Sequence, residues 1–291
     1  MPAAPRIFVQ IPAYRDTELP ATLRDLYRKA ARPDQLRTCV VWQHEPDETL
    51  AGDIRDLPGV EIIDIAADQS QGCNWARTIA QQRWNGEPFT LLLDSHHRFV
   101  RDWDNLVLAM YRQLRDMGVT KPLLTAYLPA YRPDTEPGGR GKRPYMMAPL
   151  SRDEGVLTRL TSYPIPFWTT LAEPLPAEFL SLHFVFAAGT FNTDVEFDPR
   201  IYFFGDELVT GLRAFTHGYN MFHPHRIIGW HCYDRGSRLP HWHDHPEWQH
   251  RHQQSLALMR DLFSGRPTPI ELGKVRTVHD YQELILTELV A

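Results

Sequence analysis

The sequence predicts an α/β fold in which helices cover both faces of a mostly parallel sheet. Short, largely apolar runs alternate along the chain with segments whose apolar residues recur every three or four positions. The apolar runs contain few polar residues, which is typical of parallel strands buried on both faces. The chain has 291 residues, 43% of them hydrophobic, which is enough for one large domain.

The first half of the chain contains the clearest alternation. Strands are predicted at residues 7–12, 36–42, 60–65 and 89–94, and helices at residues 19–31, 72–84 and 106–117. Pro20 lies in the first turn of the first helix, where proline is tolerated. Sheets of this kind bind ligands at the carboxyl ends of their strands, so the residues that directly follow each strand are the candidates for function.

The second half is less regular. A buried strand is predicted at residues 184–191, a short strand at 227–233, and helices at 208–216 and 255–263. Residues 129–149 are rich in proline, glycine and arginine, which predicts a mobile loop. We interpret its basic residues as solvated surface, the less favoured alternative being a lid over an anionic substrate. Those basic residues are Arg140, Lys142 and Arg143.

Charge and composition exclude several classes of partner. The net charge is −5, so no broad cationic surface for nucleic acid or anionic lipid is expected. The sequence shows no signal peptide and no apolar run of membrane-spanning length, from which we expect a cytoplasmic protein. Cys39, Cys73 and Cys232 are widely scattered and predict neither a disulfide framework nor a zinc site.

A candidate metal site follows the strand at residues 89–94. Asp94, Ser95 and His96 place a carboxylate and an imidazole at the predicted sheet edge, where both can face one cation. A site that is only partly filled by protein ligands leaves positions for diphosphate oxygens, and imidazole favours Mn²⁺ over Mg²⁺. The alternative is that Asp94 caps the next segment while His96 is a surface residue. The position at a strand end favours the metal site.

Two further clusters are ambiguous by themselves. Asp206 and Glu207 follow Gly205 at a helix start, where carboxylates are also favoured by the helix dipole. His231 ends a short apolar strand and is by itself more typical of a structural histidine. The His/Trp-rich residues 239–250 are interpreted as a solvated tail, with a second metal site or a segment packed over an acceptor cleft as alternatives.

Several of these pieces, taken together and in order, resemble a known family. They are Ile11 to Asp16, the extended stretch Asp94 to Phe99, Gly205-Asp206-Glu207, Arg213 to Tyr219, and Gly229-Trp230-His231. This set is similar to the N-acetylglucosaminyltransferases that modify hydroxyproline in a cytosolic ubiquitin-ligase subunit, and to their bacterial relatives. The polypeptide N-acetylgalactosaminyltransferases resemble it more distantly. The resemblance covers about residues 7–233.

The resemblance implies a single GT-A domain over residues 1–291, with a nucleotide-binding half to about residue 125 and an acceptor half beyond. It implies that Asp94, His96 and His231 bind Mn²⁺ or Mg²⁺, which in turn bridges the diphosphate of UDP-GlcNAc or a similar donor. Tyr14 and Arg15 would contact the base and ribose. Arg77 would help to hold the nucleotide, and Asp94 would contact it through the metal.

The implied reaction is transfer to a hydroxyl acceptor with retention of the anomeric configuration. Relatives often have Gly-Glu-Glu or Gly-Gly-Glu where this chain has Gly205-Asp206-Glu207, so either carboxylate could face the sugar, and Glu207 is preferred over Asp206. Two other functions are kept open: a metal-dependent hydrolase that uses the histidine-rich tail, and a noncatalytic sugar-nucleotide-binding module.

Overall fold

A computed structural model describes residues 6–236 and 238–291. The first half alternates strands and helices in the expected order. Its elements are β1 (Ile7–Tyr14), α1 (Leu19–Lys29), β2 (Leu36–His44), α2 (Gly52–Arg55), β3 (Val60–Ala66), α3 (Cys73–Gln81), β4 (Phe89–Leu93), β5 (His97–Phe99), α4 (Trp103–Asp116) and β6 (Pro122–Thr125).

The second half adds a hairpin, further strands and a helical C-terminal part. Its elements are β7 (Tyr145–Asp153), β8 (Val156–Pro164), β9 (Leu175–Pro176), β10 (Phe184–Ala188), α5 (Phe191–Asp194), α6 (Asp206–Thr216), β11 (Asn220–His223), β12 (Gly229–His231), α7 (His241–Asp244), α8 (Trp248–Phe263) and α9 (Val278–Ile285).

The main sheet has eight strands in the order β3-β2-β1-β4-β10-β6-β11-β9. β1 pairs in parallel with both β2 and β4, and β2 pairs in parallel with β3. β10 runs antiparallel to both of its neighbours, β4 and β6. The predicted mostly parallel α/β sheet is confirmed, with one reversed strand, β10, inside it and a second, β9, at its edge, where it runs antiparallel to β11.

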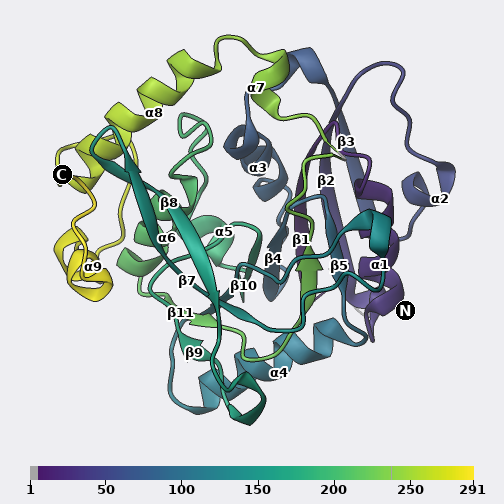
Figure 1. Cartoon of the computed structure of the whole chain (residues 1–291), viewed down its shortest axis with the longest axis horizontal. Coiled ribbons are helices and arrows are strands. Elements are labelled where there is room, and N and C mark those ends of the chain that lie inside the picture. The colour runs from purple at the N-terminus through teal and green to yellow at the C-terminus, as the bar shows by residue number, and fades with distance from the viewer. Residues whose placement is uncertain (1–5, 237) are drawn as a thin grey trace.

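Alternating side chains of β1 explain why helices lie on both faces of the sheet. Val9 and Ile11 belong to a buried cluster with α1 and α4, whereas Phe8 packs on the opposite face with Ala76 and Ala80 of α3. Successive strand residues point to opposite faces, so one fully apolar strand contributes to two cores. Figure 1 shows the helices arranged on both sides of the sheet, with the C-terminal helices α8 and α9 beside the β7–β8 hairpin.

Two expectations from the sequence need correction. The loop predicted at residues 129–149 ends inside a regular strand, because β7 begins at Tyr145 and pairs with β8. The solvated tail predicted for residues 239–250 is wrong, because Leu239 to Trp242 line the main cavity and His245 is buried. A hydrogen bond helps to hold this segment against the rest of the protein, because His245 Nε2 lies 3.1 Å from the Ala67 carbonyl oxygen.

The helix predicted at residues 255–263 is the C-terminal part of α8, which already begins at Trp248. Throughout the described residues, each helix is too short or too polar to cross a lipid bilayer.

Candidate active site

The site lies at the edge of the sheet where β4 ends. Asp94 directly follows Leu93, the last residue of β4, and His96 directly precedes β5. β5 then pairs antiparallel with β12, which places His231 opposite His97. The Cys232 N–H also donates to the His96 carbonyl oxygen at 3.0 Å. This short ladder brings a histidine from late in the chain to the Asp94 segment.

Asp94, His96 and His231 offer ligand atoms that all lie within 4.8 Å of one another. Asp94 Oδ2 lies 3.3 Å from His231 Nε2 and 3.9 Å from His96 Nε2. Burial opposes ionisation of Asp94, but the His231 hydrogen bond and the nearby His183 and Arg77 hold the pKa of its carboxyl well below the usual value. The structure therefore brings together the three residues singled out in the sequence, with an ionised carboxylate at the centre.

A second carboxylate fixes the orientation of His96. Asp16 Oδ2 lies 2.6 Å from His96 Nδ1, and Asp16 is itself held by the Ser95 hydroxyl at 2.6 Å. Because a carboxylate only accepts hydrogen bonds, the proton is on Nδ1 and the lone pair of Nε2 faces the Asp94 side. A carboxylate behind a histidine is the usual outer partner of a metal ligand. The sequence interpretation named Asp16 only as the end of a motif and gave it no role in the site.

Arg77 connects the Asp94 segment to the start of α6. One guanidinium nitrogen donates to Asp94 Oδ1 at 3.0 Å, and the other donates to Asp206 Oδ2 at 3.1 Å. Arg77 is 4% exposed. Its two ion pairs occupy the same face of the cavity, so it fixes the distance between Asp94 and Asp206.

Asp206 and Glu207 have different partners although they are adjacent. Asp206 Oδ1 accepts from the Glu207 N–H at 2.8 Å. Glu207 accepts from the Tyr127 hydroxyl at 2.6 Å and from the Leu182 N–H at 3.0 Å. Burial raises the pKa of both carboxyls above their usual values, and the charge of Asp206 raises that of Glu207 further. Both line the cavity, and their contact with a sugar stays a prediction.

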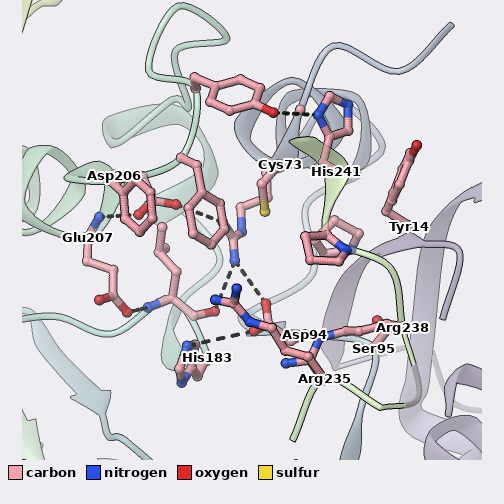
Figure 2. Close-up of a pocket in the computed structure, with 18 of the residues that line it drawn as sticks. Tyr14, Cys73, Asp94, Ser95, His183, Asp206, Glu207, Arg235, Arg238 and His241 are labelled. Atoms are coloured by element: carbon pink, nitrogen blue, oxygen red, sulfur yellow. Dashed lines mark hydrogen bonds and ion pairs between the residues drawn. The ribbon is translucent and has the colours of Figure 1, made fainter. Parts of the chain in front are cut away.

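The cavity has a volume of about 400 Å³ and is lined by all of these groups except Asp16, which lies behind His96. Arg235 and Arg238 also line it (Figure 2). Arg235 packs over the Trp242 ring at 5.0 Å, while Arg238 donates to the Asp234 carbonyl oxygen at 2.9 Å. Among the described residues, neither guanidinium has a carboxylate within ion-pair distance, so the two cations can accept an anionic ligand.

The two residues predicted to contact the nucleotide lie differently. Tyr14 lines the cavity, and its hydroxyl donates a hydrogen bond to the Asp244 carboxylate at 2.7 Å. Arg15 is engaged in ion pairs with Asp244 at 2.9 Å and Glu48 at 3.1 Å, and it is not among the residues that line the cavity. A contact between Arg15 and a nucleotide therefore stays a prediction.

His183 is a site residue that the sequence interpretation missed. Its Nε2 lies 3.9 Å from Asp94 Oδ2, and it lines the cavity. It comes directly before β10, and because β10 is antiparallel to β4, Phe184 is paired with Leu93. The start of a reversed strand thus lies at the edge where the parallel strands end. The sequence does show a histidine directly before a predicted buried strand. It does not show that this strand runs antiparallel to its neighbours, which is what places His183 at the site.

Comparison with protein families matches the chain to the family described as Glycosyltransferase (GlcNAc), over residues 6–56 and 54–287. The chain belongs to this family. Among curated protein sequences, none matches it. The resemblance seen in the sequence is therefore confirmed at the level of a glycosyltransferase family, while the hydroxyproline-modifying branch stays a prediction.

Solved structures with the same fold include GalNAc-T7 with UDP, GalNAc and Mn²⁺, at a TM-score of 0.60 and 10% identity. The match covers 97% of this chain and 54% of GalNAc-T7, so the chain spans about half of that protein. Another is residues 1–349 of S. aureus TarS, at a TM-score of 0.53 and 12% identity, covering 89% of this chain and 72% of that chain. The predicted GT-A fold is confirmed by these likenesses, which at such identities concern the fold alone.

Proposed function

We propose that this glycosyltransferase is metal-dependent and moves a sugar, GlcNAc, from UDP to a hydroxyl acceptor with retention of configuration. The observation that carries the proposal is the convergence of Asp94, His96 and His231 in the lining of a cavity that is also lined by Arg77 and Asp206. Solved structures with the same fold contain UDP-GlcNAc, in TarS, and UDP with Mn²⁺, in GalNAc-T7.

The side chains fit a divalent cation. Asp94 is ionised, and Asp16 leaves the Nε2 lone pair of His96 free to bind, so one oxygen and one nitrogen ligand are already prepared. His231 supplies the second nitrogen through Nε2. Two imidazoles and one carboxylate suit Mn²⁺ better than Mg²⁺. When bound, the cation supplies Lewis-acid neutralisation of the diphosphate leaving group.

The chain's own residues bind and orient the donor. Arg235 and Arg238 would pair with phosphate oxygens, because they line the cavity without carboxylate partners among the described residues. Tyr14 also lines the cavity and would contact the base or ribose. Asp206 and Glu207 lie at the start of α6, where they would contact the sugar hydroxyls or stabilise positive charge at the anomeric carbon.

In this reaction the bond between the anomeric carbon and the phosphate oxygen breaks, and a bond from that carbon to the acceptor oxygen forms. The acceptor proton passes to an oxygen of the departing diphosphate, so the products are the glycoside and UDP. Retention requires attack on the face from which the diphosphate leaves. The low dielectric of the cavity strengthens each of these electrostatic contacts.

The test is incubation of the purified protein with a panel of sugar nucleotides and hydroxyl acceptors, with Mn²⁺ or with EDTA. We expect release of UDP that depends on metal and acceptor, and a product whose anomeric configuration by NMR matches the donor. Binding of UDP-GlcNAc without turnover would indicate a noncatalytic module. Hydrolysis that needs no sugar nucleotide would indicate a metal-dependent hydrolase, and either result would overturn the proposal.

A further inference from the structure

The two histidines of the proposed metal site are held in different ways. His96 has Asp16 behind its Nδ1 at 2.6 Å, which fixes the plane of its ring. His231 Nδ1 is buried and has no hydrogen-bond partner among the described residues. A ligating histidine ordinarily needs its second nitrogen held, because this fixes the ring orientation. Apart from the contact of its Nε2 with Asp94 at 3.3 Å, something other than a hydrogen bond must therefore orient the ring of His231.

Ring packing provides this constraint. The His183 ring lies parallel to the His231 ring, with centroids 4.2 Å apart and planes 5° apart. The Tyr127 ring is stacked in turn with His183, at 4.9 Å and 16°. Tyr233 contacts His231 edge-on, with centroids 4.4 Å apart and planes at 63°. A face contact combined with an edge contact leaves the His231 imidazole little freedom to rotate.

The far end of the stack is fixed by a short hydrogen bond. The Tyr127 hydroxyl donates to Glu207 at 2.6 Å, and Glu207 is fixed to the Leu182 N–H at 3.0 Å. Leu182 is the residue directly before His183 in the chain. The stack thus runs from the carboxylate at the start of α6 to the imidazole beside Asp94, and the residues at both of its ends line the cavity.

We propose that Tyr127 and His183 are positioning residues that hold the metal ligand His231 by ring stacking, in place of the hydrogen bond that orients His96. The inference rests on the proposed metal-dependent function. It assigns His183 an aromatic role rather than a role as a fourth ligand. A metal ion lies in the plane of an imidazole that binds it, so two parallel rings that are stacked face to face cannot both point at one ion.

The experiment is a titration of the purified full chain with Mn²⁺, in which binding is monitored by EPR. It compares the unaltered protein with two variants of His183. His183→Ala removes the ring, and we expect it to weaken Mn²⁺ binding about tenfold, the lower end of the range for outer partners of metal ligands. His183→Phe keeps a flat ring without nitrogen atoms and should bind Mn²⁺ within about threefold of the unaltered protein. Melting temperatures without metal show whether both variants fold.

Tyr127→Leu is a second probe farther from the ion. It removes the outer ring of the stack, and we expect a smaller loss of Mn²⁺ affinity than in His183→Ala. Pulsed EPR of bound Mn²⁺ gives a separate readout, because the proposal predicts couplings to two imidazole nitrogens, from His96 and His231. The His183→Phe spectrum should show the same two couplings.

The outcomes separate the proposals. If His183→Phe binds as weakly as His183→Ala while both melt normally, or if three imidazole couplings appear, His183 is a ligand and the stacking role is wrong. If His183→Ala binds as tightly as the unaltered protein, the stack does not position His231. If the unaltered protein binds no Mn²⁺ at all, the proposed metal-dependent function fails, and this inference fails with it.

Discussion

Each oxygen of the Asp94 carboxylate faces a different set of partners. Oδ1 accepts from Arg77, while Oδ2 faces the Nε2 atoms of His231 and His96. One side chain therefore joins a cationic network to the imidazole group. Removal of a partner from such a buried network is costly, because the remaining charge stays uncompensated. A substitution at this site can therefore weaken metal binding, folding or both. The two effects are best separated with a residue whose side chain borders the cavity.

His96 meets that condition, since it lines the cavity. We expect His96→Ala to weaken Mn²⁺ binding by more than about 100-fold, because a lost ligand costs more than a lost outer partner. The melting temperature should fall by no more than about 4 °C. Metal titration and thermal unfolding measure the two effects. His279→Ala, on the exposed surface of α9, is the matched control and should change neither.

A second prediction concerns Asp206 and Glu207, the two carboxylates at the start of α6. Replacement of Asp206 or Glu207 by the neutral amide should lower turnover at saturating Mn²⁺ by about 100-fold, the size expected for a lost transition-state contact. Asp206→Asn also leaves Arg77 with one carboxylate fewer, so it should raise the KM for the donor, whereas Glu207→Gln should mainly lower kcat. Unchanged turnover in either variant would remove that residue from the mechanism.

At the scale of elements, β11 contains a histidine that must stay neutral. The His223 Nδ1–H donates to the Thr125 carbonyl oxygen at 3.1 Å, and its Nε2 accepts from the Met147 N–H at 3.3 Å. His223 is 3% exposed, and burial lowers its pKa to about 4. A proton on Nε2 would face the Met147 N–H, so β11 and β7 are joined only by the uncharged form.

This arrangement predicts a pH-dependent stability. Because the folded pKa lies below the unfolded value, the unfolded chain binds more protons on acidification, and the contribution of His223 is lost as the pH falls from about 6.5 to about 4. By pH 5 the loss is about 2 kcal/mol in the free energy of unfolding. Denaturant unfolding at pH 7 and pH 5 measures it. His223→Gln keeps a donor and an acceptor but does not titrate, so equal pH slopes in variant and unaltered protein would contradict the prediction.

Comparison of the observed helices and strands with the predicted ones shows which elements could be recognised from the sequence. The strands β1, β2, β3 and β4 are continuous apolar runs, and α1, α3, α4 and α6 have an apolar stripe, so these were predicted within a few residues. The hairpin was not predicted. The register of β7 against β8 shifts between Pro149 and Ser151, and this irregularity breaks the two-residue alternation that identifies a strand. The first turns of α8 are polar, so only its apolar end was recognised.

The candidate site was only partly predictable for a related reason. Asp94 and His96 follow a parallel strand, where function is expected, and His231 was placed beside them by resemblance. Asp16 and His183 could be recognised as site residues only by knowing which distant segments the fold brings together. Asp16 and His96, for example, are 80 residues apart in the sequence. Pairing of that kind is set by tertiary packing and leaves no local periodicity.

At the scale of the whole molecule, the C-terminal part is tied back to the first strand. Asp244, at the end of α7, accepts from the Tyr14 hydroxyl and from Arg15, both at the end of β1. This link holds His241 and Trp242 against the cavity. Residues from the last third of the chain therefore line the same cavity as residues from the first third.

The link predicts a selective effect on donor binding. Asp244→Asn removes the negative charge that pairs with Arg15, although its amide oxygen can still accept hydrogen bonds, so α7 should loosen and the KM for the sugar nucleotide should rise about tenfold. kcat should change less, because the metal cluster is untouched. Asp261→Asn, in a surface ion pair of α8, serves as the control. A fall in kcat with an unchanged KM would contradict this role for Asp244.

The ladder between β5 and β12 has one more consequence. It joins only three residue pairs, yet it closes a loop that contains most of the second half of the chain. Ordering so long a loop is entropically slow, and it cannot begin before the ribosome has released β12. A nascent chain that contains Asp94 and His96 but not His231 lacks one ligand of the proposed metal site. Capture of an ion at the proposed site would then require that the chain has been synthesised past β12 and that β12 has paired with β5.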